Sequence, residues 1–91
     1  MSQINLSPMG PHQFGVQVTE GDVTTSHQVT VPENLLDELG LFDTDEEAVV
    51  RESIAFLLER EPATSIMDEF SLDVIPRFFP EYSEELTRRL S

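Results

Sequence analysis

The side chains that could catalyse a reaction or bind a transition metal are few in this chain and lie far apart in sequence. The 91 residues include two histidines, His12 and His27, and no cysteine. Neither histidine has a second ligand at a spacing typical of a metal site, and thiolate sites are excluded. Ser53 and Ser65 have no histidine close in sequence that could act as their base. His27 lies in a run of β-forming residues, which favours a packed or surface position over a role as general base.

The carboxylates are numerous, but their arrangement is typical of a solvated surface. General acid–base catalysis needs carboxylates gathered in a pocket, whereas these are spread over predicted helix starts and exposed faces. Asp43, Asp45 and Glu47 do not follow the spacing of a calcium-binding loop, and the sequence has no glycine-rich phosphate loop. The sequence therefore predicts a protein that is not an enzyme and that binds no cofactor or metal ion.

The charge balance is the strongest signal in the composition. The chain has 18 Asp and Glu residues against five Arg and no Lys, which gives a net charge of −13. Such a surface repels phosphate backbones and anionic membranes, and it attracts basic partners or cations. We therefore expect a basic protein partner and no binding to nucleic acid or to membranes. Adaptation to a salt-rich cytosol is the alternative, in which case the charge serves solubility alone.

Aromatic side chains are concentrated in residues 70–82, which read Phe-Ser-Leu-Asp-Val-Ile-Pro-Arg-Phe-Phe-Pro-Glu-Tyr. Aromatic rings flanked by carboxylates can anchor a hydrophobic groove while the acids engage a basic rim. The alternative is that the rings complete the core, because so small a domain needs most of its aromatics inside. The candidate partner-binding residues of this segment are Phe70, Ile75, Phe78, Phe79, Glu81 and Tyr82.

A β-hairpin is predicted near the start of the chain. Residues 1–13 contain two prolines and a glycine with little periodicity, so we expect them to form a flexible lead-in. Apolar side chains then recur at every second position of residues 14–18, and a second β-rich run spans residues 23–31. Gly21 supplies the turn between them, which completes the hairpin.

Helices are predicted for most of the remaining chain, each with an apolar stripe or a recognisable start or stop. They are expected at residues 33–39, at 45–61, in short pieces that begin at Ser65 and Ser71, and at 84–90. The fold class is therefore α+β, with a small N-terminal hairpin followed by about four helices. Residues 14–91 should form a single small domain.

The helix predicted over residues 45–61 carries two apolar strips. One is the regular stripe of Val50, Ile54, Leu57 and Leu58, and a second lies beside it. A domain of this size is too small to cover both, so we expect one strip to meet a second copy of the chain. The sequence therefore predicts a homodimer, with the candidate interface residues Val49, Ser53 and Phe56.

Residues 27–61 combine an alternating strand, a proline, a short leucine-rich helix, a glycine-containing loop and a longer capped helix that includes Val-Val-Arg-Glu-Ser-Ile. This layout resembles the ribbon-helix-helix family. The resemblance implies an intertwined homodimer with strands paired across the two-fold axis and with Gln28 and Thr30 reading the major groove of DNA. In that family the start of the second helix holds DNA phosphates, whereas residues 45–47 of this chain are three carboxylates, which repel phosphates.

Two functional classes follow from these observations. The first is a small acidic protein–protein interaction, accessory or regulatory module that binds a basic partner. The second is a ribbon-helix-helix transcriptional regulator or antitoxin that contacts DNA through its strand.

The sequence has no apolar run of the ~20 residues that a bilayer requires and no signal-peptide pattern, so we expect a cytoplasmic protein.

Overall fold

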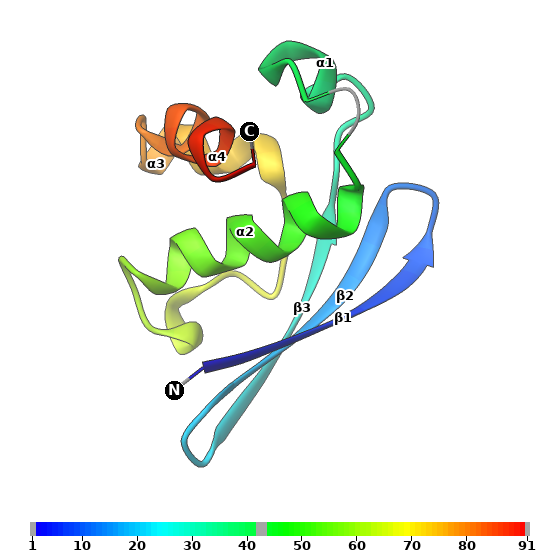
Figure 1. The fold of residues 1–91 in the computed structure, drawn as a ribbon. Coiled ribbons are helices and arrows are strands. Elements are labelled where there is room, and N and C mark those ends of the chain that lie inside the picture. The colour runs from blue at the N-terminus through cyan, green and yellow to red at the C-terminus, as the bar shows by residue number, and fades with distance from the viewer. Residues whose placement is uncertain (1, 42–43, 91) are drawn as a thin grey trace.

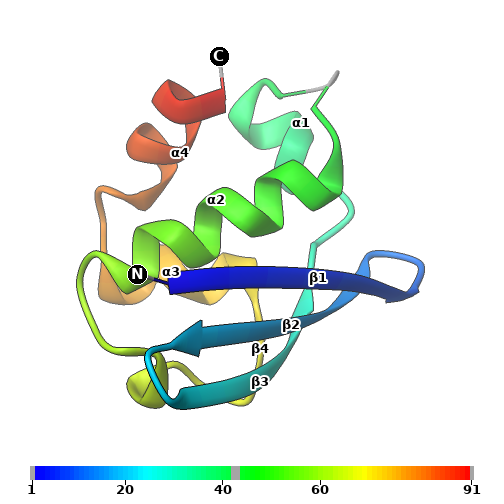
Figure 2. The ribbon, with the colours of Figure 1, turned by 60° about the horizontal axis from the view of Figure 1, so that its bottom comes forward.

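The protein is an α+β fold in which helices cover one face of a four-stranded sheet (Figures 1 and 2). The computed structural model describes residues 2–41 and 44–90. The strands are β1 (Ser2–Gly10), β2 (Gln13–Glu20), β3 (Val23–Thr30) and β4 (Glu69–Ser71). They lie side by side in the order β1-β2-β3-β4. The first three form an antiparallel meander, and β4 pairs with β3 in parallel.

The chain crosses from β3 to its parallel neighbour β4 through two helices and a turn of 3₁₀-helix, as a parallel connection requires. The four α-helices are α1 (Leu35–Leu39), α2 (Glu46–Leu58), α3 (Ile75–Phe78) and α4 (Tyr82–Leu90). Two 3₁₀ turns, η1 (Ala63–Ser65) and η2 (Leu72–Val74), flank β4. Gly40 ends α1 in the left-handed conformation, with φ 71°, which glycine adopts at little cost.

The predicted hairpin is confirmed as β2 and β3, but residues 1–13 differ from the expected flexible lead-in. Ser2–Gly10 form the strand β1, which pairs with β2 from Ser2 to Pro8 and, after a bulge at Met9, again at Gly10. Ile4 and Leu6 alternate with polar residues and place their side chains on the helix-covered side, opposite Val18 and Val16. Pro8 is compatible with this strand because an edge strand leaves half of its N–H groups without a ladder partner.

The fourth strand is also a correction, since we expected a short helix to begin at Ser65. Residues 63–65 form the turn η1, and the chain then extends into β4 beside β3. Phe70 pairs with Val29 and joins the core, where it is 8% exposed. Pairing with a strand forty residues away therefore decides the conformation of this segment, as tertiary context often does.

The two faces of the sheet differ in composition. The inner face carries mainly the apolar side chains of Phe14, Val16, Val18 and Val29, which pack against α2. The outer face carries uncharged polar residues along β1 to β3, among them Gln3, Asn5, Ser7, Gln17, Ser26 and Gln28. Along β1, β2 and β3 this face carries no acidic side chain, and Asp68 and Glu69 border it at the β4 edge.

Helix α2 is the centre of the core, and this corrects the expected dimer interface. Val49, Ser53 and Phe56 are each 0% exposed within a single chain. Both apolar strips of α2 are covered because the sheet packs on one side of the helix and α4 on the other (Figure 1). These three residues therefore leave no surface for a second copy.

Candidate functional site

An apolar hollow of about 300 Å³ lies where the end of α2 meets the segment around β4 and α3. Its floor consists of buried apolar side chains, and its rim is exposed. The lining residues are Leu57, Glu61, Ser65, Ile66, Met67, Phe70, Val74, Ile75, Phe78 and Phe79. We call this site the Phe78 pocket. A concave, mostly apolar site of this size can accept a small ligand or an anchoring side chain of a partner.

The rim of the pocket exposes two large apolar side chains. Phe78 is 66% exposed and Met67 is 46% exposed. Ile66, Phe70 and Ile75, by contrast, are at most 8% exposed and form the floor. An exposed phenylalanine beside a preformed hollow is typical of a docking site rather than of a core.

Hydrogen bonds from β3 position the segment that carries Met67. The Nδ1–H of the buried His27 donates to the carbonyl of Met67 at 2.8 Å, and its Nε2 is 2.8 Å from the hydroxyl of Thr25. The N–H of Gln28 donates to the carbonyl of Asp68 at 2.7 Å. His27 is therefore a packed residue with both ring nitrogens engaged, and it fixes one wall of the pocket.

The surroundings of the pocket are acidic. Glu61 lines it, and the exposed Asp73 precedes the lining residue Val74. Asp68 lines a separate hollow on the outer face of the sheet, and Glu69 faces the same way because it alternates with Phe70 on β4. Within the part of the chain that the structure describes, none of these four carboxylates takes part in an ion pair. Arg77 is the cation beside them. The site thus joins an apolar centre to two acids, Glu61 and Asp73, and one cation, and two further acids lie on the adjoining sheet face.

Four of the six residues predicted for partner binding meet in this pocket. Phe70, Ile75, Phe78 and Phe79 all line it, but Tyr82 and Glu81 do not. The Tyr82 ring is 0% exposed and lies 5.3 Å from the Phe56 ring in an edge-to-face contact. Tyr82 is therefore a core residue, which corrects its expected role.

The Tyr82 hydroxyl is part of a buried chain of hydrogen bonds. Ser53 donates to the carbonyl of Val49 at 2.7 Å, so the Tyr82 hydroxyl, also 2.7 Å away, donates to the Ser53 oxygen. Burial raises the pKa of Tyr82 to about 12, against the opposing effect of the Ser53 hydrogen bond. The neutral phenol is therefore strongly favoured in the folded chain.

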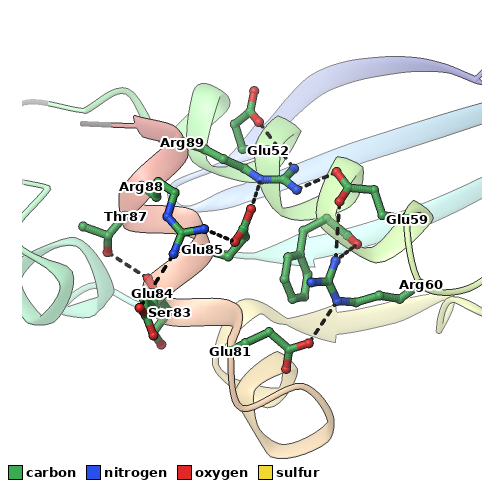
Figure 3. A network of polar contacts seen from close by, with 11 residues as sticks. Glu52, Glu59, Arg60, Glu81, Ser83, Glu84, Glu85, Thr87, Arg88 and Arg89 are labelled. Atoms are coloured by element: carbon green, nitrogen blue, oxygen red, sulfur yellow. Dashed lines mark hydrogen bonds and ion pairs between the residues drawn. The ribbon is translucent and has the colours of Figure 1, made fainter.

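Glu81 points instead into a network of arginines and carboxylates between α2 and α4 (Figure 3). Its carboxylate accepts a hydrogen bond from Arg60 at 3.2 Å. A hydrogen bond from its own backbone, followed by the contact with Arg60, lowers the pKa of Glu81. The Arg60 guanidinium also lies 3.7 Å from the centre of the Phe56 ring and covers it.

Arg89 joins the two helices in the same network (Figure 3). Its guanidinium donates to Glu59 of the α2 C-cap and to Glu85 of α4, and it lies 3.8 Å from Glu52. The contact with Glu59 is the main cause of the raised pKa of Arg89. Arg51, Arg60 and Arg88 also form ion pairs with acids of this chain. Four of the five arginines thus pair with acids of the same chain, and within the described residues none of them pairs with Glu61 or Asp73.

Added salt is expected to raise the melting temperature, because a net charge of −13 repels itself in the compact state and ions screen that repulsion. Thermal unfolding followed by circular dichroism at low and at molar salt measures the effect. A variant with Glu61→Gln, Asp68→Asn and Asp73→Asn should be more stable at low salt and gain less from salt. A melting temperature that salt leaves unchanged would contradict the argument.

The other predicted residues lie apart from the pocket. Gln28 and Thr30 lie on the outer face of β3, a strand that is paired on both sides. The His12 Nδ1 contacts Glu46 at the start of α2, at a turn where His12 adopts a φ of 60°. Over residues 2–41 and 44–90, no three metal-ligating side chains gather into a site, and no helix is long and apolar enough to cross a bilayer.

Sequence reasoning missed six of the ten lining residues, among them Leu57, Ile66 and Met67. Leu57 was assigned to a regular core stripe, and the other two to a short helix. A methionine followed directly by acids was the available signal, since Met is adaptable and frequent at binding surfaces.

Comparisons with protein-family models, with curated proteins and with solved structures found no significant match to this chain.

Proposed function

We propose that this protein is a small, cytoplasmic, non-enzymatic interaction module that binds a basic protein segment through the Phe78 pocket. The observation that carries the proposal is Phe78 itself, 66% exposed at the rim of an apolar hollow. A solvated phenylalanine in this position costs free energy in the isolated chain, and a partner that covers it recovers that free energy.

The occupant is an apolar anchor flanked by Lys or Arg. The floor of Ile66, Phe70 and Ile75 accepts an apolar side chain, and Phe78 and Met67 close over it. The carboxylates of Glu61 and Asp73 then meet one basic flank of the segment, and those of Asp68 and Glu69, on the adjoining sheet face, meet the other. Interface binding energy concentrates in such central apolar anchors, while the charged rim raises the association rate and selects the partner.

A defined peptide pair tests the proposal. One peptide is an amphipathic helix with Leu and Phe on one face and Lys and Arg on the other, and its counterpart carries Glu in place of every basic residue. Fluorescence anisotropy should show binding of the basic peptide alone. Phe78→Ala should weaken that binding about tenfold or more, which corresponds to about 1.4 kcal/mol.

Val23 supplies the matched control. It is also an exposed apolar residue, 47% exposed, but it lies at the start of β3 away from the pocket. Val23→Ala should leave the affinity for the basic peptide unchanged. Equal affinity of wild type and Phe78→Ala, or equal binding of the acidic peptide, would refute the proposed site.

The alternative, a ribbon-helix-helix regulator, requires the strand that holds Gln28 and Thr30 to pair with its copy across a two-fold axis. Strand β3 lies between β2 and β4, so this pairing would require one of its neighbours to leave. The net charge of −13 also opposes contact with phosphates. We therefore favour the interaction module and expect no shift of labelled duplex DNA at low salt. A shift would support the regulator instead.

A further inference from the structure

The two edges of the sheet are protected very differently. The β4 edge has three residues, and exposed acids lie within and beside it. The β1 edge is nine residues long, Ser-Gln-Ile-Asn-Leu-Ser-Pro-Met-Gly, without a single charged side chain. Soluble proteins usually protect edge strands by shortening them or by adding charges, because a bare edge pairs with other strands. Residues Gln3–Ser7 carry neither protection themselves, and the charged side chain bonded at this edge is Arg51 of α2.

One hydrogen bond shows which backbone N–H and C=O groups of β1 point away from β2. Arg51 of α2 donates to the carbonyl of Ile4 at 3.2 Å, so this carbonyl points away from β2. In an antiparallel strand the N–H and C=O of a residue point to the same side, and alternate residues share that side. The N–H of Ile4 and both polar groups of Leu6 therefore also face outward, ready to pair with another strand.

The distribution of negative charge favours a second copy of this chain as the strand that pairs with the β1 edge. Two copies of a chain with a net charge of −13 repel each other over most of their surface. The β1 edge is the exception, because its side chains and the neighbouring outer face of the sheet are uncharged. Arg51, which reaches the Ile4 carbonyl, pairs with Glu47 at 3.5 Å, and Glu20 lies opposite Ser2 at the start of the strand. A second copy therefore meets the least repulsion along this edge.

We propose that two copies of the chain pair through their β1 strands in antiparallel orientation, with Asn5 opposite Asn5. This register lets Ile4 and Leu6 of each copy exchange both backbone hydrogen bonds with Leu6 and Ile4 of the other. It places Pro8, which has no N–H, at the ends of the pairing. Arg51 releases the Ile4 carbonyl to the incoming N–H of Leu6. The two sheets become one sheet of eight strands.

The dimer keeps the Phe78 pockets apart and open. Phe70 of β4 lines the pocket, and β4 lies at the opposite edge of the sheet from β1. Pairing through β1 therefore leaves one pocket near each end of the joined sheet. If both pockets are occupied by one partner with two basic segments, the second contact becomes intramolecular and the overall affinity rises.

A charge-swap experiment tests the register. The mass of wild type, by light scattering in moderate salt, should be twice that of the 10.3 kDa chain. Asn5→Asp and Asn5→Arg should each be monomeric, since like charges directly opposite destabilise a strand pair. An equimolar mixture of the two should recover the dimer mass. Gln17→Asp, with the same change in charge on the neighbouring inner strand, should remain dimeric.

Amide hydrogen exchange adds a readout that identifies the edge. The amides of Ile4 and Leu6 should exchange slowly in wild type and at least tenfold faster in Asn5→Asp, where they face solvent. A monomeric wild type would overturn the proposal. So would a dimer that survives both Asn5 variants, a mixture that stays monomeric, or equal exchange of the two amides in wild type and Asn5→Asp.

Discussion

Replacing Tyr82 with alanine should lower the free energy of unfolding by about 3–5 kcal/mol, the range for large aromatics removed from a core. The ring is 0% exposed, and it packs edge-to-face on Phe56 at 5.3 Å between ring centres. The Ser53 oxygen would also lose the hydrogen bond that it now accepts from the Tyr82 hydroxyl. Urea unfolding followed by circular dichroism measures the loss.

Two further variants show how much of this loss comes from the buried ring and how much from the hydroxyl. Tyr82→Phe keeps the packing, and Ser53 keeps its bond to the Val49 carbonyl, so the loss should be about 1 kcal/mol. Phe78→Ala removes a ring of similar size four residues away, yet it should change stability by no more than about 0.5 kcal/mol, because Phe78 is 66% exposed. Similar losses for Tyr82→Ala and Phe78→Ala would contradict the assignment of one ring to the core and the other to a surface.

The second large effect is a loss of stability in alkaline solution. The pKa of Tyr82 rises from 10.0 in the unfolded chain to about 12 in the folded one. A group with a raised folded pKa gives its full contribution below the unfolded pKa and loses it as the pH rises through the folded value. Stability should therefore fall between pH 10 and 12. Since one pKa unit corresponds to about 1.4 kcal/mol, the total loss is on the order of 2–3 kcal/mol.

The composition of the chain makes the alkaline loss of stability easy to assign to one side chain. It has one tyrosine, no lysine and no cysteine, so Tyr82 is the side chain that titrates between pH 10 and 12. Phenolate absorbance should show ionisation delayed in the folded protein relative to the protein in urea. Tyr82→Phe should lose little stability over the same range. An equal alkaline loss in Tyr82→Phe would show that other groups are responsible.

The sequence predicted those strands and helices whose own residues show a clear apolar period. The alternation of residues 14–18 gave β2, and the capped apolar stripe of residues 45–61 gave α2. Strand β1 was missed because Pro8, Gly10 and Pro11 are also typical of a loop, and pairing with β2 outweighs them. Strand β4 was missed since its three residues become a strand only beside β3.

The aromatic segment of the candidate site was visible in the sequence, but the roles of its rings were not. Pro76 and Pro80 interrupt any helical period across the segment, so spacing alone does not separate inward from outward rings. Tertiary packing makes the distinction. Helix α4 carries Tyr82 onto Phe56, while the short α3 leaves Phe78 in solvent. The same packing covers Val49 and Phe56, whose strip on α2 resembled a dimer surface in sequence alone.

The most direct test of the proposed function is a map of the basic peptide on the protein by NMR. In a titration of ¹⁵N-labelled protein with the Lys- and Arg-rich amphipathic peptide, the amide signals of residues 61–79 should shift. The signals of β1 and of the β2–β3 turn should stay in place, and Phe78→Ala should abolish the shifts. Shifts that follow the acidic surface as a whole, or that persist in Phe78→Ala, would contradict binding at the Phe78 pocket.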